Sequence, residues 1–228
     1  MTLPQPLRRL RSFVRRDSRI TDAQERAYAN QWPSFGLNLS DGLLDIDKLF
    51  GRLAPRRLEI GYGMGVSLLA AASAYPEMDF IGVETHKPGV GALMSGIEAA
   101  GLTNLRTFHG DVIDILANCV PDASLDSIQI FFPDPWQKRR HHARRLVQAD
   151  FIKKIIEKIK PAGQLHLATD WEDYAKQMML VLSTETQLTN AAGKDQFAER
   201  SPYRPILSKF EKRAHQEGRG VWDLQFYR

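Results

Sequence analysis

A proline-locked turn that carries one carboxylate and one indole is followed at once by a cluster of positive charge. The apolar residues 128–132 are typical of a buried strand, and Pro133-Asp134-Pro135-Trp136 comes directly after them. Five cationic side chains then lie within residues 138–145. A carboxylate can accept hydrogen bonds from the edge of a nucleobase, an aromatic ring can stack on its face, and cations can bind phosphates. The pattern therefore indicates an enzyme site for a nucleic-acid base.

A glycine-rich turn earlier in the chain is the second chemical motif. The segment Glu59-Ile60-Gly61-Tyr62-Gly63-Met64-Gly65 follows a strand expected over residues 58–60 and precedes a helix expected over 66–74. Glycines there permit positive φ and close approach of a ligand to the backbone. Glu84 ends the next expected strand, 23 residues after Gly61, and a carboxylate at that place can accept hydrogen bonds from ribose hydroxyls. The two features together predict a nucleoside-containing cofactor.

The spacing of the glycines separates two cofactor classes. A dinucleotide fingerprint needs glycine or alanine three residues after the second glycine, but Val66 stands there. Glu59 and Asp134 would repel a pyrophosphate and suit a sulfonium cation with an ammonium group. We therefore favour S-adenosylmethionine over a dinucleotide and over a purely structural turn. Asp111 is expected to touch the adenine amino group or to cap the helix expected over 112–118, and both roles can hold together.

The elements that position these groups alternate along the chain, which predicts a doubly wound, mostly parallel α/β sheet. The seven expected strands cover residues 58–60, 80–84, 104–108, 125–132 and 164–168, with two more near 185–190 and 221–227. Helices are expected over 66–74, 89–100, 112–118, 148–160 and 171–182, with a further short helix or docking segment over 41–50 and a polar loop over 193–220. Ligands in such sheets bind outside the carboxyl ends of the strands, so Glu84, Asp111 and Asp134 should meet in one crevice.

Composition indicates one α/β domain with two basic regions. The hydrophobic content of 43% and the charged content of 25% are ordinary for a globular chain of 228 residues. The net charge is only +4, but six arginines lie in the first twenty residues against a single acid, Asp17. This arm and the cluster at 138–145 favour a nucleic-acid partner over two solvated faces. We expect residues 1–30 to form a flexible basic arm and residues 31–228 to form the domain.

Several classes of protein are disfavoured by what the sequence lacks. The one cysteine, Cys119, permits no intramolecular disulfide. The N-terminal residues contain no apolar stretch of a secretory signal, and no run reaches the roughly 18 apolar residues of a membrane span. His141 and His142 are adjacent and cannot share a metal ion on a helix. We expect a cytoplasmic protein with no metal site and no membrane partner, as a monomer or a homodimer.

Taken together, these motifs resemble the bacterial tRNA (guanine-N7-)-methyltransferases, which modify guanine 46 in the variable loop. The resemblance extends from about residue 58 to the C-terminus. Its motifs are residues 58–65, 81–84 with 88–91, 131–136 with the basic run, 168–172, and 208–211 with 220–224. The resemblance implies a class I S-adenosylmethionine-dependent methyltransferase fold, with tRNA as the substrate.

The motif match also implies roles for single residues. Asp134 is expected to be the catalytic residue, and the cofactor site is expected to contain Glu59, Gly61, Gly63, Gly65, Glu84, Asp111 and Asp134. The expected substrate contacts are Lys138, Asp170, Ser208, Lys209, Phe210 and Glu211, and the expected RNA contacts are Arg140, His141, His142, Arg144 and Arg145. Gln137, Ser208 and Tyr62 differ from the residues that the family often has, but none of them removes a charge that the scheme needs.

Guanine N7 has a free lone pair and no proton, so its attack on a sulfonium methyl group needs no general base. Holding N7 and the methyl carbon in line can then supply much of the catalysis. We expect Asp134 to orient the base and to stabilise the growing positive charge, with obligatory proton acceptance as the alternative. Asp170 is a second candidate for this role, or it caps the helix that follows.

Other interpretations remain open at this stage. Trp136 can stack on a base or pack beneath the next helix. A non-catalytic RNA-binding protein on a methyltransferase fold is disfavoured by the intact acids and glycines. An NAD-dependent oxidoreductase is disfavoured by Val66.

Overall fold

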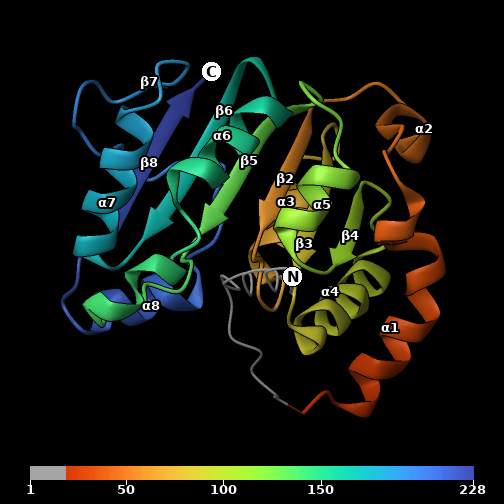
Figure 1. Cartoon of the computed structure of the whole chain (residues 1–228). Coiled ribbons are helices and arrows are strands. Elements are labelled where there is room, and N and C mark those ends of the chain that lie inside the picture. The colour runs from red at the N-terminus through yellow and green to blue at the C-terminus, as the bar shows by residue number, and fades with distance from the viewer. Residues whose placement is uncertain (1–18) are drawn as a thin grey trace, which may run out of the picture.

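In the computed structural model, which describes residues 19–228, a sheet of eight strands lies between two layers of helices (Figure 1). The strand order is β1-β4-β3-β2-β5-β6-β8-β7. The strands are β1 (Gly36–Leu37), β2 (Arg56–Ile60), β3 (Asp79–Glu84), β4 (Leu105–His109), β5 (Leu125–Phe131), β6 (Ile159–Thr169), β7 (Thr189–Asn190) and β8 (Trp222–Tyr227). The pairs of β8 with β6 and with β7 are antiparallel, and the other pairs are parallel.

The helices bury two apolar clusters against the sheet. One cluster contains side chains from α1, α3 and α4, and the other contains side chains from α2, α5, α6 and α7. The helices are α1 (Asp22–Phe35), α2 (Ile46–Phe50), α3 (Val66–Ala74), α4 (Lys87–Ala100), α5 (Val112–Asn118), α6 (Ala149–Lys158), α7 (Glu172–Ser183) and α8 (Lys209–Gln216), with the short 3₁₀ helices η1 (Leu39–Asp41) and η2 (Arg139–Arg144). Within residues 19–228, none of these helices combines the length and hydrophobicity that a membrane span needs.

The sheet changes its winding direction at β2. The chain runs outward from β2 through β3 to β4 on one side, and then returns to β5 and β6 on the other side. The loops after β2 and β5 therefore leave in opposite directions, which opens a crevice at the carboxyl ends of these strands. This arrangement confirms the doubly wound, mostly parallel sheet. The sheet has eight strands rather than the expected seven because Gly36 and Leu37 pair with β4.

The segment 193–220 is not only a loop, because α8 forms within it. Its first turn is a capping box: Ser208 Oγ accepts from the Glu211 N–H at 3.1 Å, and the Glu211 carboxylate accepts from the Ser208 N–H at 2.7 Å. The Thr-x-x-Glu sequence at residues 169–172 has the pattern of a capping box, but no capping box forms there. Thr169 is still the last residue of β6, and its hydroxyl accepts only from the Trp171 N–H, at 3.3 Å.

The structure differs from the expected flexible arm over residues 22–30, which form the first part of α1. Thr21 and Gln24 make a capping box at its start, and Ala27 is buried. The helix lies directly on α4, where a β-carbon added at Gly91 would stand 2.7 Å from the carbonyl oxygen of Gln24. Residues 1–18, with five of the six arginines in the first twenty residues, lie outside the described residues. The division into an arm and one domain remains a prediction.

Candidate functional site

The glycine turn after β2 is built for close approach between two segments. Gly61, Gly63 and Gly65 have φ of +75°, +60° and +76°, values that favour glycine. A β-carbon at Gly89, in the first turn of α4, would lie 2.1 Å from the Gly63 carbonyl oxygen. Only glycine at position 89 therefore lets α4 begin this close to the turn.

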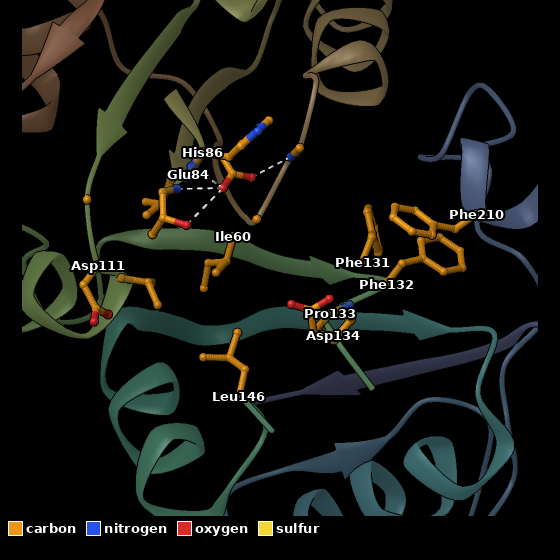
Figure 2. Close-up of a pocket in the computed structure, with 16 residues that line it drawn as sticks. Ile60, Glu84, His86, Asp111, Phe131, Phe132, Pro133, Asp134, Leu146 and Phe210 are labelled. Carbon is orange, nitrogen blue, oxygen red and sulfur yellow. Dashed lines mark hydrogen bonds between the residues drawn. The ribbon is translucent and has the colours of Figure 1, made fainter. Parts of the chain in front are cut away.

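Glu84, at the end of β3, fixes the shape of this turn. One carboxylate oxygen accepts from the Gly63 N–H at 2.8 Å. The other accepts from the Thr85 and His86 N–H groups at 2.6 and 2.9 Å (Figure 2). Glu84 thus joins β3, the glycine turn and the start of α4, while its carboxylate borders a cavity.

That cavity lies at the carboxyl ends of the central strands and encloses about 270 Å³. Glu84, Asp111 and Asp134 line it from the ends of β3, β4 and β5, and Phe210 reaches it from α8 (Figure 2). Asp111 also caps α5, because it accepts from the Ile113 N–H at 3.0 Å. The convergence of the three acids in one crevice is confirmed, and the capping interpretation of Asp111 is confirmed alongside it.

The turn that carries Asp134 has a strained backbone. Phe132 and Trp136, two residues to either side of Asp134, have φ of +50° and +45°. Such values cost a non-glycine residue roughly 1–2 kcal/mol. Strain of this kind persists where neighbouring contacts hold it, and it is frequent at functional sites. One such contact is the hydrogen bond from the Phe132 N–H to the Ala168 carbonyl, at 2.8 Å. Asp134 itself is exposed.

Glu59 lies beneath the glycine turn and lines a second, larger cavity between α3 and α8. Its side chain is buried. Burial raises the pKa of Glu59 to about 7; the Arg57 charge opposes this rise, and the Glu84 charge adds to it. A cationic group in this cavity would lower the pKa again and hold Glu59 ionised.

The basic segment after the Asp134 turn divides into an exposed part and a buried residue. Lys138, Arg139, Arg140 and Arg144 are exposed on and beside η2. Arg145 is only 2% exposed and is bonded within the protein. The expectation that Arg145 contacts RNA is therefore wrong for this conformation, because its guanidinium faces the interior.

Trp136 packs within this basic segment. Its ring meets His141 edge-on, with 5.9 Å between centroids, and the Arg144 guanidinium lies 5.0 Å from the ring centroid. Slight desolvation and the charges of Arg144, Arg140 and Lys138 lower the pKa of His141. Of the two interpretations of Trp136, these contacts favour packing against η2.

The remaining expected substrate residues lie at two places. Asp170, after β6, forms an ion pair with Arg219, which also donates to the Asp170 carbonyl at 2.9 Å. Asp170 does not cap α7, whose first flanking residue is Trp171. Lys209 and Phe210 are exposed on α8. Their contact with a substrate remains a prediction.

Glu211, another expected substrate contact, is buried. It is 2% exposed, and its carboxylate lies 2.9 Å from Arg200 Nε and 3.2 Å from a terminal nitrogen of Arg204. Burial alone would raise its pKa, but the Ser208 N–H bond and these two arginines lower it. These contacts favour a structural role for the Glu211 carboxylate.

A buried network beneath α8 was missed by the sequence reasoning. Arg204 donates to Asp223 of β8 at 2.7 Å, and Asp223 lies 2.7 Å from Nε2 of His166 on β6. The same guanidinium lies 5.3 Å from the Phe131 ring centroid and 5.8 Å from that of Phe132. The only local signal was the Ser-x-x-Glu capping pattern at 208–211, since the other partners come from distant segments.

Metal ligation has no support in the described part of the chain. Over residues 19–228, no group of three or more His, Cys, Asp or Glu side chains is placed to hold a metal ion.

The chain is similar to known proteins in both sequence and fold. Residues 54–224 match the model of a family described as "Putative methyltransferase". A curated relative from Idiomarina loihiensis is 51% identical over 220 residues, which cover 96% of this chain and 89% of the relative. One from Hydrogenovibrio crunogenus is 50% identical over 226 residues, covering 99% and 94%. Both are named tRNA (guanine-N(7)-)-methyltransferase.

Solved structures share the fold at low sequence identity. The 16S rRNA methyltransferase KamB aligns with a TM-score of 0.60 and 13% identity, covering 81% of this chain and 94% of that one. TrmN from Thermus thermophilus aligns with a TM-score of 0.53 and 17% identity, covering 80% and 47%. These likenesses show the methyltransferase fold.

Proposed function

This chain belongs to the tRNA (guanine-N7-)-methyltransferase family, and we propose that it transfers a methyl group from S-adenosylmethionine to N7 of guanine 46 in the variable loop of tRNA. The observation that carries the proposal is the crevice at the carboxyl ends of β3, β4 and β5. Three carboxylates line it beside a glycine turn, and an exposed basic segment follows the strained turn at its rim.

The residues of this crevice fit the donor. Gly61 and Gly63 leave open space, since a β-carbon on either would meet no atom within 4 Å. Glu84 stands where a ribose would bind, and Asp111 stands where an adenine amino group would bind. When bound, S-adenosylmethionine supplies an electrophilic methyl group on a cationic sulfur. Three acids, with no lysine or arginine among the lining residues, suit that cation and disfavour a pyrophosphate.

Glu59 serves the donor from beneath the turn. Its pKa of about 7 means that about half of the Glu59 carboxyls hold a proton at neutral pH before the donor binds. An ammonium group in the adjoining cavity would favour the ionised form. Glu59 would thus recognise the amino end of the donor and lose its proton on binding.

Asp134 acts on the guanine. Methylation at N7 makes the base cationic and its N1 and N2 protons more acidic, so a carboxylate that accepts from this edge binds the transition state better than the substrate. The strained turn presents Asp134 at the cavity, with the Phe132 ring beside it. No proton has to leave N7, so Asp134 orients and stabilises the base without acting as a base itself.

The exposed cations Lys138, Arg139, Arg140 and Arg144 lie on the same rim and would bind phosphates of the variable loop. Lys209 and Phe210 line the larger cavity between α3 and α8, and Phe210 also lines the crevice. Both side chains would contact the nucleotide. A tRNA substrate also agrees with the expected cytoplasmic location, which remains a prediction, as does the oligomeric state.

The test uses radiolabelled methyl donor with two unmodified tRNA transcripts, one carrying guanine at position 46 and one carrying adenine. We expect label in the first alone, with strand scission at that position after borohydride and aniline treatment. Donor binding without transfer to either transcript would favour the alternative, a non-catalytic RNA-binding protein on this fold. Label in both transcripts would mean that the methylated base lies at a position other than 46.

A further inference from the structure

The guanidinium of Arg145 is buried behind the turn that carries Asp134. Its Nε donates to the carbonyl of Pro135, the residue after Asp134, at 2.8 Å. The neighbouring Arg144 is exposed, whereas Arg145 is 2% exposed. Two adjacent arginines of one basic cluster therefore serve different purposes.

The two terminal nitrogens of the same guanidinium donate hydrogen bonds to side chains of α7. One terminal nitrogen donates to Gln177 Oε1 at 2.5 Å, and the other donates to Asp173 at 2.6 Å. The group also lies 4.7 Å from the ring centroid of Tyr174. Arg145 thus bridges the Asp134 turn and the first two turns of α7, the helix that starts just after Asp170.

The Asp134 turn needs such support. Phe132 and Trp136 both hold positive φ, while Pro133 and Pro135 carry no N–H with which the turn could fasten itself. The Phe132 N–H bond to Ala168 holds the front of the turn. The Arg145 bond holds the Pro135 carbonyl at its back.

We propose that Arg145 is a positioning residue for the methyl transfer, which holds Asp134 in its productive orientation by tying the Pro135 carbonyl to α7. The inference rests on the proposed function. The planar, forked guanidinium is what the geometry requires, since it reaches a carbonyl, an amide and a carboxylate at once. A lysine ammonium is a single point of charge and cannot span all three.

The kinetic test is Arg145→Lys, which keeps the charge and loses the fork. At saturating tRNA and donor, we expect the single-turnover rate to fall at least tenfold. The Kd for tRNA, its salt dependence and the Kd for the donor should stay within twofold of wild type. Lys153→Ala, which removes an exposed cation on α6, is the matched control. Arg144→Ala should instead weaken tRNA binding and flatten its salt dependence.

A second readout does not depend on turnover. Amide hydrogen exchange of a peptide covering residues 130–138 should be faster in Arg145→Lys, with the peptide over α3 unchanged. If the wild-type protein methylates neither transcript, the proposed function fails, and this exchange still decides whether Arg145 holds the turn.

The partners of Arg145 provide variants that leave the buried arginine in place. Gln177→Ala and Asp173→Asn should each lower the single-turnover rate and speed exchange in the same peptide, by less than Arg145→Lys does. They decide the question if Arg145→Lys fails to fold. Wild-type rates and exchange in these variants would overturn the proposal, as would an Arg145→Lys defect confined to tRNA affinity with a flatter salt dependence.

Discussion

The ring of Phe210 lies parallel to the ring of Phe132, with 5.6 Å between centroids and 14° between planes. Phe210 belongs to α8, and Phe132 belongs to the strained turn before Asp134. Both rings border both cavities. The stack therefore stands where the cavity at the ends of β3, β4 and β5 meets the larger cavity between α3 and α8. The stack joins α8 to the turn that carries Asp134, and Phe210 is 51% exposed, which leaves part of its ring accessible to a nucleobase.

Phe210→Ala should therefore lower kcat/KM for tRNA about tenfold, because stacking of a base on an aromatic ring contributes roughly 1–3 kcal/mol. Donor affinity, measured by calorimetry, should change little. The control is Leu180→Ala, which truncates an exposed apolar side chain on a different helix, α7. An unchanged kcat/KM in Phe210→Ala would show that the ring only packs on Phe132.

Asp134→Asn should lose most of the methyl-transfer rate but keep measurable single-turnover chemistry. The amide still accepts one hydrogen bond, while the negative charge that stabilises the cationic base is gone. Asp150→Asn, at an exposed acid on α6, controls for the loss of charge. Complete loss of the chemical step, with a wild-type rate that follows the titration of one carboxyl, would show instead that Asp134 is an obligatory proton acceptor.

Glu84→Gln should weaken both the fold and donor binding. Three backbone N–H groups point at this carboxylate, and the amide NH₂ of glutamine would face at least one of them. A buried donor left without a partner costs about 1–3 kcal/mol. Denaturant unfolding should show that loss, and calorimetry should show a higher Kd for the donor. Glu77→Gln, on the surface, should change neither.

Glu59 should make donor binding depend on pH. Its carboxyl, with a pKa of about 7 against an ordinary 4.5, must lose a proton before it can pair with a cation. Donor affinity should thus rise from about pH 5.5 to about pH 7 with net proton release. The free energy of unfolding without donor should change in the opposite direction with pH. The raised pKa of Glu59 favours the protonated folded state, so this contribution to stability is lost as the pH rises through 7.

Calorimetry in buffers of different ionisation enthalpy measures this proton release directly. Glu59→Gln should abolish it and should flatten the pH dependence of unfolding over the same range. Proton release that persists undiminished in Glu59→Gln would place the titrating group elsewhere.

The network under α8 should be important for stability. Asp223→Asn leaves the buried Arg204 guanidinium, which is 4% exposed, without one of its two carboxylate partners. Breaking a buried pair in this way costs about 3–5 kcal/mol. Denaturant unfolding should show this loss. The exposed pair of Glu172 and Lys176 provides the comparison, and Glu172→Gln should leave the free energy of unfolding nearly unchanged. An equally small effect of Asp223→Asn would mean that water compensates Arg204.

Much of the crevice could be predicted from the sequence because its parts are local. Three glycines have positive φ, and each of Glu84, Asp111 and Asp134 lies at or just after the end of its own strand. A doubly wound sheet brings such strand ends to one edge, so the convergence of these acids required no knowledge of side-chain packing. The helix α8 could also have been predicted, since Ser208 and Glu211 form a regular capping box.

Position in the tertiary structure decided the rest. Arg144 and Arg145 look alike in the sequence, yet one is exposed and the other bridges Pro135 to α7. Arg204, Asp223 and His166 come from three segments that no local pattern connects. The strand ends and the chemistry they carry could be predicted from local conformational preference and from the alternation of strands and helices. Burial and pairing depend on which distant segments meet, and only the folded chain decides that.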